Sequence, residues 1–462
     1  MSRALRVATG LGLLLVVAVT ILVEWRLGTR AEAAQPFVAL ALVALLTPQV
    51  RRGRQAFVAV ALVLTSVLAL RDPGWAAAVR AGLANAAFIC ALFCALAGLR
   101  SVAERAPAIR RAGLFLAGQP PGRRYVALTF GGQVFALVLN YGAISLLGAL
   151  ATGSTDAEPD AVIRRHRSRR MLLAIQRGFT SVLPWSPLSF AVAITTVLVP
   201  GTTWSEVALP GMVTGLLMAG TGWAMDTAFK PKLAGPRPVR TAPEGSWLSM
   251  SPLLILLAIL GTSIVTLYVA FGVRIVGVVL FVVPLVAVAW VLAQERGDLR
   301  KVGAWARGHV FGELPATAGE VVLLMMAGYI GAVGAALLIP ILEAGRVDLS
   351  GVPAPALVVG LIWIMPFAGQ LGMNPILAAT LIAPLVPPAE TMGIAPATVV
   401  AAITAGWALT GVTSPFTATT VLVGSFGRVS PHHVGLVWNR GYFLAAASVV
   451  SVWMLLFARF LG

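Results

Sequence analysis

Long apolar runs without a charged residue recur along the whole 462-residue chain, and this feature limits the possible fold more than any other. A run of ~20 apolar residues is the length an α-helix needs to cross the hydrocarbon core of a bilayer. The runs are continuous and do not alternate between apolar and polar residues, which excludes a membrane β-barrel. Only 11% of the residues are charged, against about 25% in soluble domains. The sequence therefore predicts an all-α polytopic membrane protein.

Eleven of these runs have the length of a full membrane span. The first follows Arg3 and Arg6 and resembles a signal peptide, but its apolar stretch from Val7 to Val23 is long and favours a membrane helix. The predicted spans are 5–24, 34–49, 56–70, 75–98, 178–200, 208–227, 248–271, 275–293, 317–341, 395–423 and 438–460.

The 34 lysine and arginine residues lie mostly in short loops between these runs, so the formal charge of +17 does not indicate nucleic-acid binding. Cytoplasmic loops of membrane proteins carry such an excess of cations. One alternation of spans places nearly all of them on one side, including the segments 51–54, 230–240 and 296–307. This predicts a multi-pass protein of a bacterial-type inner membrane, with a cytoplasmic N-terminus and an external C-terminus.

Two further apolar segments predict re-entrant hairpins. The first, 125–155, lies between two arginine clusters that both predict a cytoplasmic position. It is too short for two crossings of ~20 residues each. A hairpin that returns to its own side fits, with the turn formers Asn140 and Gly142 at its tip. The flanking arginines are Arg100, Arg105, Arg110, Arg111, Arg123 and Arg124 on one side, and Arg164, Arg165, Arg167, Arg169, Arg170 and Arg177 on the other.

The second such segment, 349–389, has flanks poor in cations, which predicts an external position. Its middle, 369-GQLGMNP-375, is again rich in turn formers. We predict a hairpin over 353–389 that enters from the opposite side, with Asn374 and Pro375 at its tip. Two full spans also fit the length of this segment.

Short matches in the two halves of the chain indicate an internal repeat. The stretch 186-SPLSFAVAITTVLV-199 resembles 414-SPFTATTVLVGSF-426, and each follows a predicted hairpin. The hairpin entries 130-FGGQ-133 and 367-FAGQ-370 also match. Repeats inserted with opposite orientation are typical of secondary transporters. The sequence thus predicts broken helices at 178–200 and 395–423, one in each inverted repeat.

The prolines of these matches point to a binding site. Pro187 and Pro415 lack an N–H, which frees the carbonyls of Leu183 and Gly411 from their helical hydrogen bonds. Exposed carbonyl ends suit a cation such as Na⁺, and the N-terminus of the following half-helix suits an anion. A proline kink eased by hydroxyl side chains is the plainer alternative. The predicted substrate and ion site comprises Asn140, Gly142, Ser186, Pro187, Ser189, Asn374, Pro375, Ser414, Pro415 and Thr417.

No enzyme signature stands out in the sequence. It contains no nucleotide-binding glycine-rich loop with lysine, no metal-binding His/Glu pair and no Ser/His/Asp set. We therefore expect no enzymatic activity and no cofactor beyond a coupling ion. Acidic residues are scarce in the spans, which favours Na⁺ over H⁺. Cys90 and Cys94 are expected to be small buried hydrophobic residues.

The arrangement of spans, opposed hairpins, broken helices and a basic interfacial arm before the first hairpin resembles the ion transporter superfamily. That group includes divalent anion/sodium symporters, citrate and arsenite carriers, and the large membrane subunit of TRAP transporters. Where the divalent anion/sodium symporters carry Ser-Asn-Thr, the hairpin tips here read Asn140-Tyr141-Gly142 and Met373-Asn374-Pro375.

The resemblance implies an elevator mechanism and ion-coupled transport of a small anionic organic solute such as a carboxylate. A transport domain of residues 125–227 and 353–437 would slide against a scaffold of residues 1–124, 228–352 and 438–462, which would form a homodimer. Two alternatives stay open. One is a TRAP-type subunit that acts with a separate solute-binding protein, and the other is a non-transporting membrane assembly or lipid-handling protein.

Overall fold

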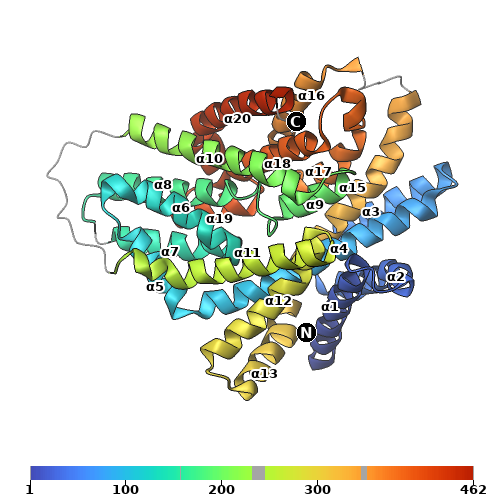
Figure 1. Ribbon diagram of the computed structural model, residues 1–462, viewed down its shortest axis with the longest axis horizontal. Coiled ribbons are helices and arrows are strands. Elements are labelled where there is room, and N and C mark those ends of the chain that lie inside the picture. Colours follow the sequence, from blue (N-terminus) through green and yellow to red (C-terminus); the bar gives the residue numbers. More distant parts are fainter. Residues whose placement is uncertain (1, 157, 231–244, 345–350, 461–462) are drawn as a thin grey trace. The chain divides into compact units, whose positions relative to one another are not determined.

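The computed structural model describes residues 2–156, 158–230, 245–344 and 351–460, and this part of the chain is helical without any strand (Figure 1). Ten of its helical segments are long and apolar enough to cross a membrane. The predicted all-α polytopic membrane protein is confirmed. The ten segments are α1 (Arg3–Glu24), α2 (Thr29–Leu46), α3 (Arg52–Arg71), α4 (Trp75–Arg105), α10 (Trp204–Ala228), α11 (Ser251–Phe271), α12 (Ile275–Gln294), α15 (Ala318–Ala344), α18 (Pro396–Thr413) with α19 (Ala418–Gly427), and α20 (Arg440–Phe460).

The one predicted span that is not among these ten segments is 178–200, and its predicted start is wrong. Helix α8 (Ala161–Thr180) begins well before it, and α9 (Phe190–Leu198) follows an irregular stretch. Asp160 caps α8 by accepting hydrogen bonds from the backbone N–H groups of Val162 and Ile163. Arginine is a good helix former, so the basic flank continues the helix. Arg177, expected on a cytoplasmic flank, is therefore a helical residue.

The chain divides into two compact units that interleave along the sequence. Unit 1 consists of Met1–Val102, Leu260–Gly351 and Ile376–Pro387, and unit 2 consists of Ala103–Ile259, Val352–Pro375 and Pro388–Gly462. The division into transport and scaffold domains stays a prediction. The units depart from its boundaries where α17 (Pro375–Ile382) falls almost entirely in unit 1 and α20 falls in unit 2. The predicted cytoplasmic segment 230–240 lies outside the described residues, except for Lys230.

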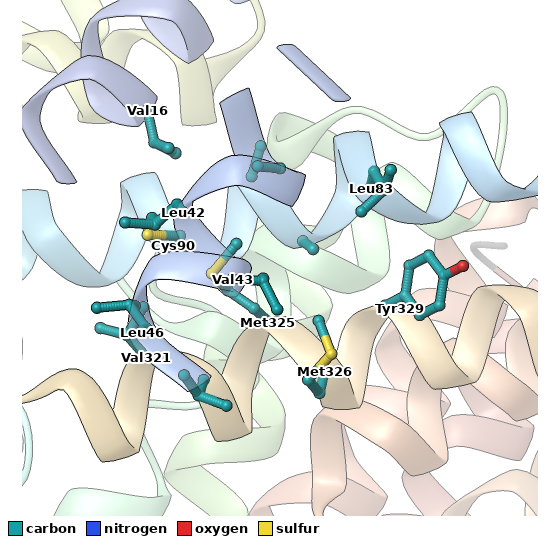
Figure 2. Close-up of a cluster of buried hydrophobic side chains, with 14 of the residues drawn as sticks. Val16, Leu42, Val43, Leu46, Leu83, Cys90, Val321, Met325, Met326 and Tyr329 are labelled. Carbon is teal, nitrogen blue, oxygen red and sulfur yellow. The ribbon is translucent and has the colours of Figure 1, made fainter. Parts of the chain in front are cut away.

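The core of unit 1 is formed by apolar side chains of α1, α2, α4 and α15 (Figure 2). Cys90 and Cys94 are both buried there as free thiols, as the sequence predicts. Tyr329 brings a hydroxyl to the edge of this core, where it is hydrogen-bonded to Thr65 of α3 at 2.7 Å. The labelled core residues are Val16, Leu42, Val43, Leu46, Leu83, Cys90, Val321, Met325, Met326 and Tyr329.

The basic arm before the first hairpin is the amphipathic helix α5 (Pro107–Ala117) of unit 2. Ile109 and Leu116 are buried, whereas Arg110 and Arg111 are exposed. A helix with one apolar and one basic face suits the surface of an anionic leaflet.

Both predicted hairpin segments form a pair of helices separated by a turn. In unit 2, α6 (Pro121–Leu139) and α7 (Gly142–Asp156) pack against each other and against α8 (Figure 1). Asn140 makes the turn between them with φ 49° and ψ −131°, outside the left-handed helical region in which asparagine is enriched. In the second segment, α16 (Ala354–Gln370) ends at a turn that contains Gly372 with φ 86°, and α17 begins at Pro375. Gly142 starts α7 and does not need a positive φ.

In both repeats of unit 2, a glycine of the broken helix lies against the backbone of the first hairpin helix. Helix α6 packs closely on α8, and α16 packs closely on α18. Aligning Ser186 with Ser414 places Gly178 opposite Gly406. A Cβ at Gly406 would lie 2.8 Å from the carbonyl oxygen of Ile362, and a Cβ at Gly178 would collide with the backbone of Thr129. The first helix of each hairpin thus approaches its own broken helix through a glycine.

Candidate functional site

The first break separates α8 from α9, and a serine spans it. The hydroxyl of Ser189 donates a hydrogen bond to the carbonyl of Leu183 at 2.9 Å. The same oxygen accepts one from the N–H of Val192 at 3.2 Å and so caps α9. The buried Ser186 accepts a hydrogen bond from the N–H of Leu188. The carbonyl that Pro187 frees is therefore held by a hydroxyl.

The second break separates α18 from α19 and is also lined by hydroxyls. The carbonyl of Gly411 accepts hydrogen bonds from the amide of Gln176, at 3.2 Å, and from the hydroxyl of Thr419. The carbonyl of Ser414 accepts bonds from Thr417 and Thr420, at 2.9 and 2.6 Å. At both breaks, then, side-chain donors replace the helical hydrogen bonds that proline removes, as in the plainer alternative of an eased kink.

The first helix of each hairpin is hydrogen-bonded to its own broken helix. The bonds involve residues of the matching segments 130-FGGQ-133 and 367-FAGQ-370, here called the FxGQ matches. In repeat 1, the amide of Gln133 donates to the hydroxyl of Ser181 at 2.8 Å. In repeat 2, the hydroxyl of Ser414 donates to the carbonyl of Gly369 at 2.7 Å. The same hydroxyl accepts a bond from the N–H of Phe416. Ser414 is thereby fixed between the hairpin and the start of the next half-helix.

The two breaks meet inside unit 2. Gly411 faces the first break, since a Cβ there would lie 2.9 Å from Cγ2 of Thr180 and 3.9 Å from Cδ1 of Leu183. A small cavity opens beside this contact and includes residues of both repeats, with Trp407 supplied by α18. Its free volume is about 20 Å³, which has room for about one water molecule and not for an organic solute. The lining residues are Ala136, Leu137, Asn140, Tyr141, Phe179, Val182, Leu183, Ser186, Leu188, Ser189, Phe190, Ala191 and Trp407.

The cavity combines polar and aromatic walls. The polar groups are supplied by Asn140, Ser186 and Ser189, all predicted from sequence. Tyr141 stacks on Phe179 with ring centroids 5.2 Å apart. None of the lining residues is charged, so the cavity offers hydrogen-bonding groups and ring faces but no ionic partner.

The remaining predicted residues occupy the hairpin turns and the second break. Gly142 is buried at the start of α7, and Pro187 lies within the first break. Ser414, Pro415 and Thr417 form the second break, whose half-helix α19 receives no side-chain cap. Asn374 and Pro375 lie at the start of α17. The role of all ten residues in binding stays a prediction.

A buried polar cluster in unit 2 escaped the sequence analysis. It contains Gln176 and Arg177 of α8, Tyr125 of α6, Asn439, and Tyr442 of α20. A signal was present, because Gln176 and Arg177 follow the apolar run 171-MLLAI-175 and end the basic flank inside an apolar setting. The arginines before this run made Arg177 look like part of the same basic flank.

No family model and no curated protein matches the sequence. Solved structures do match. The YdaH transporter of Alcanivorax borkumensis, described as having an unusual topology, superposes with a TM-score of 0.62 at 17% identity, over 89% of this chain and 99% of that chain. MtrF of Neisseria gonorrhoeae, which belongs to a class of antimetabolite efflux pumps, gives 0.58 at 16% identity, over 92% and 98%. This chain has their fold. The likeness extends over nearly the whole of all three chains.

Replacing Ser189 by alanine is expected to lower the melting temperature of the purified protein. The substitution removes both the cap of α9 and the donor to Leu183, which together stabilise by about 1–2 kcal/mol. Ser189→Thr keeps the hydroxyl and is the matched control. Equal melting of Ser189→Ala and the wild type would show that the hydroxyl does not hold the break.

Proposed function

We propose that this protein is a secondary active transporter of a small anionic organic solute such as a carboxylate, coupled to Na⁺ or H⁺ and of the elevator type. The observation that carries the proposal is the meeting of two broken helices inside unit 2, each held by its own hairpin helix. Half-helices that end near the middle of a membrane protein supply oriented N–H and C=O groups for a solute and its coupling ion. The shared fold with two transporters supports the same reading.

In this proposal, unit 2 is the moving part and unit 1 the scaffold. The support is that both broken helices, both FxGQ matches and the cavity all belong to unit 2. The small volume of the cavity suits a state without solute. We further propose a bacterial-type inner membrane with a cytoplasmic N-terminus and an external C-terminus, supported by the distribution of cations along the sequence. A homodimer through the scaffold is proposed from the resemblance to the ion transporter superfamily alone.

The proposal is tested first by a thermal-shift screen of the purified chain. Organic anions and their uncharged amides are compared with and without Na⁺, and at two pH values. Antimetabolites are included because MtrF belongs to a class of antimetabolite efflux pumps. An anion that raises the melting temperature, and more so with the coupling ion, is the expected result. Flux of that anion is then measured in proteoliposomes under an imposed Na⁺ or H⁺ gradient.

The outcome in proteoliposomes separates the proposal from its alternatives. Gradient-driven flux by the chain alone supports a secondary transporter and excludes dependence on a solute-binding protein. Flux that appears only after a soluble protein is added points to a TRAP-type subunit. No stabilisation and no flux with any probe contradicts the proposal and favours a non-transporting membrane protein.

A further inference from the structure

Arg177 is a buried cation whose partners carry no compensating charge. It lies in α8 of unit 2 and is only 5% exposed. Its guanidinium donates to the side-chain oxygen of Asn439, at 3.1 and 3.2 Å, and to the hydroxyl of Tyr125 at 3.0 Å. Its carbon lies 4.2 Å from the ring centroid of Tyr442. These described partners are two neutral oxygens and an aromatic face.

A neighbouring arginine shows the usual solution to the same problem. Arg170, two turns earlier in α8, makes two hydrogen bonds to the carboxylate of Asp226, at 2.6 and 2.7 Å. Burying a charge without a counter-charge is costly, and ionisable groups within membrane segments are retained mainly where they act. The uncompensated charge of Arg177 therefore calls for a functional explanation.

The hydrogen bonds around Arg177 lead in one direction to the second break. Arg177 donates to Asn439, whose amide donates to the side-chain oxygen of Gln176 at 3.0 Å. The amide of Gln176 in turn donates to the carbonyl of Gly411 at 3.2 Å. In this series of hydrogen bonds every donor points away from the guanidinium. The amide groups of Asn439 and Gln176 therefore both direct their N–H ends toward the second break. Gln176 and Asn439 are fully buried, so solvent does not screen the effect.

This series of hydrogen bonds ends at the carbonyl of Gly411, a group that would otherwise repel an anion. Gly411 lies in the last turn of α18, where the unpaired carbonyls of a helix carry partial negative charge. Proline at position 415 removes the usual donor to Gly411, and Gln176 supplies another. Hydrogen bonds linked in series polarise one another. The polarised hydrogen bonds thereby extend the positive electrostatic potential of Arg177 toward the second break.

We propose that Arg177 sets the charge preference of the second break, and that Asn439 and Gln176 relay its charge to Gly411, so that the break favours anions. This inference rests on the proposed function and deepens it, since it names the residues that select the charge of the solute. Arg177 faces away from the cavity residue Phe179, two positions along the helix, and so acts through other residues and does not touch the solute.

The test measures the electrostatic potential at the break without any solute. Cys90 and Cys94 are replaced by alanine, and Thr417→Cys places one thiol at the break. The purified full-length chain is labelled with anionic and cationic methanethiosulfonate reagents, and the ratio of the two rates is the readout. Arg177→Met is expected to lower the anionic-to-cationic ratio by about tenfold, the effect of removing a nearby unit charge in a poorly screened site. Gln176→Met keeps the charge and cuts the relay, and is expected to lower the ratio as well.

Arg169→Met is the control. Arg169 carries the same charge on the same helix but lies over the ring of Trp438, outside the relay, so the ratio should not change. An unchanged ratio in both Arg177→Met and Gln176→Met overturns the proposal, as does a thiol that neither reagent reaches. If the labelling ratio falls in Arg177→Met but not in Gln176→Met, the role of Gln176 and Asn439 as a relay is wrong. If Arg177→Met does not elute as a monodisperse protein, Gln176→Met decides. Because no solute is used, this result is independent of whether transport is observed.

Discussion

Replacing Gly178 or Gly406 by alanine is expected to lower the melting temperature of the purified protein by a few °C, an overpacking effect of roughly 1–3 kcal/mol. The added methyl group would meet backbone atoms of the hairpin helix in both cases. Backbone atoms cannot rotate away as a flexible side chain can, so α6 would have to move off α8, and α16 off α18. We expect similar losses at the two positions because they are equivalent in the repeat. Melting followed by intrinsic tryptophan fluorescence measures them.

Gly220 is the matched control for this pair. It lies in α10, also in unit 2, and a Cβ added there would meet no atom of another element within 4 Å. Alanine is the better helix former by up to about 1 kcal/mol, so Gly220→Ala should leave the melting temperature unchanged or raise it. If Gly178→Ala and Gly406→Ala behave like Gly220→Ala, the close approach of hairpin and broken helix is not required for stability.

Ser414→Ala is expected to reduce solute flux at least tenfold while the protein still inserts and purifies. Ser414 is 1% exposed, and its hydroxyl links the hairpin carbonyl of Gly369 to the N–H of Phe416. Losing both bonds detaches the break from the hairpin helix and frees the N–H of Phe416 before α19, at a cost of about 1–3 kcal/mol, whereas the carbonyl of Gly369 keeps its bond from the N–H of Gly372. We expect Asn374→Ala to have the same effect on flux. Proteoliposome flux at matched protein density provides the measurement.

Ser425→Ala controls for the chemistry of the substitution. Ser425 belongs to the same half-helix α19, but its hydroxyl is exposed and bonds only to the carbonyl of Leu422 one turn back. Flux should be unchanged in this variant. Normal flux in Ser414→Ala, with a normal melting temperature, would remove Ser414 from the site.

The hydrophobic pattern predicted most helices because length and apolarity decide which segments can cross a bilayer. The prediction went wrong at α8, where hydropathy and helix propensity disagree. The arginines before Arg177 interrupt the apolar run but favour helix, and Asp160 starts that helix long before position 178. Similarly, the turn at Asn140 followed from its residue type, whereas its positive φ required the backbone itself.

The binding role of the ten predicted residues stays a prediction, and the hydrogen bonds at the two breaks were not predicted. Three of these residues, Asn140, Ser186 and Ser189, line one cavity. The donors to the freed carbonyls were not foreseen, since Gln176 and Gly411 are far apart in sequence and meet only through the packing of α8 against α18. Asn439 also escaped notice, because a single asparagine before an apolar run carries no periodic signal.

The short half-helices place a demand on the biogenesis of the protein. Helices α9 and α19 have 9 and 10 residues, or about 14–15 Å, roughly half the thickness of the hydrocarbon core. Neither can be integrated into the bilayer as an independent segment. Helix α9 is synthesised long before α18, against which it packs. During synthesis, α9 therefore lacks its packing partner α18 until the second half of the chain has emerged from the ribosome.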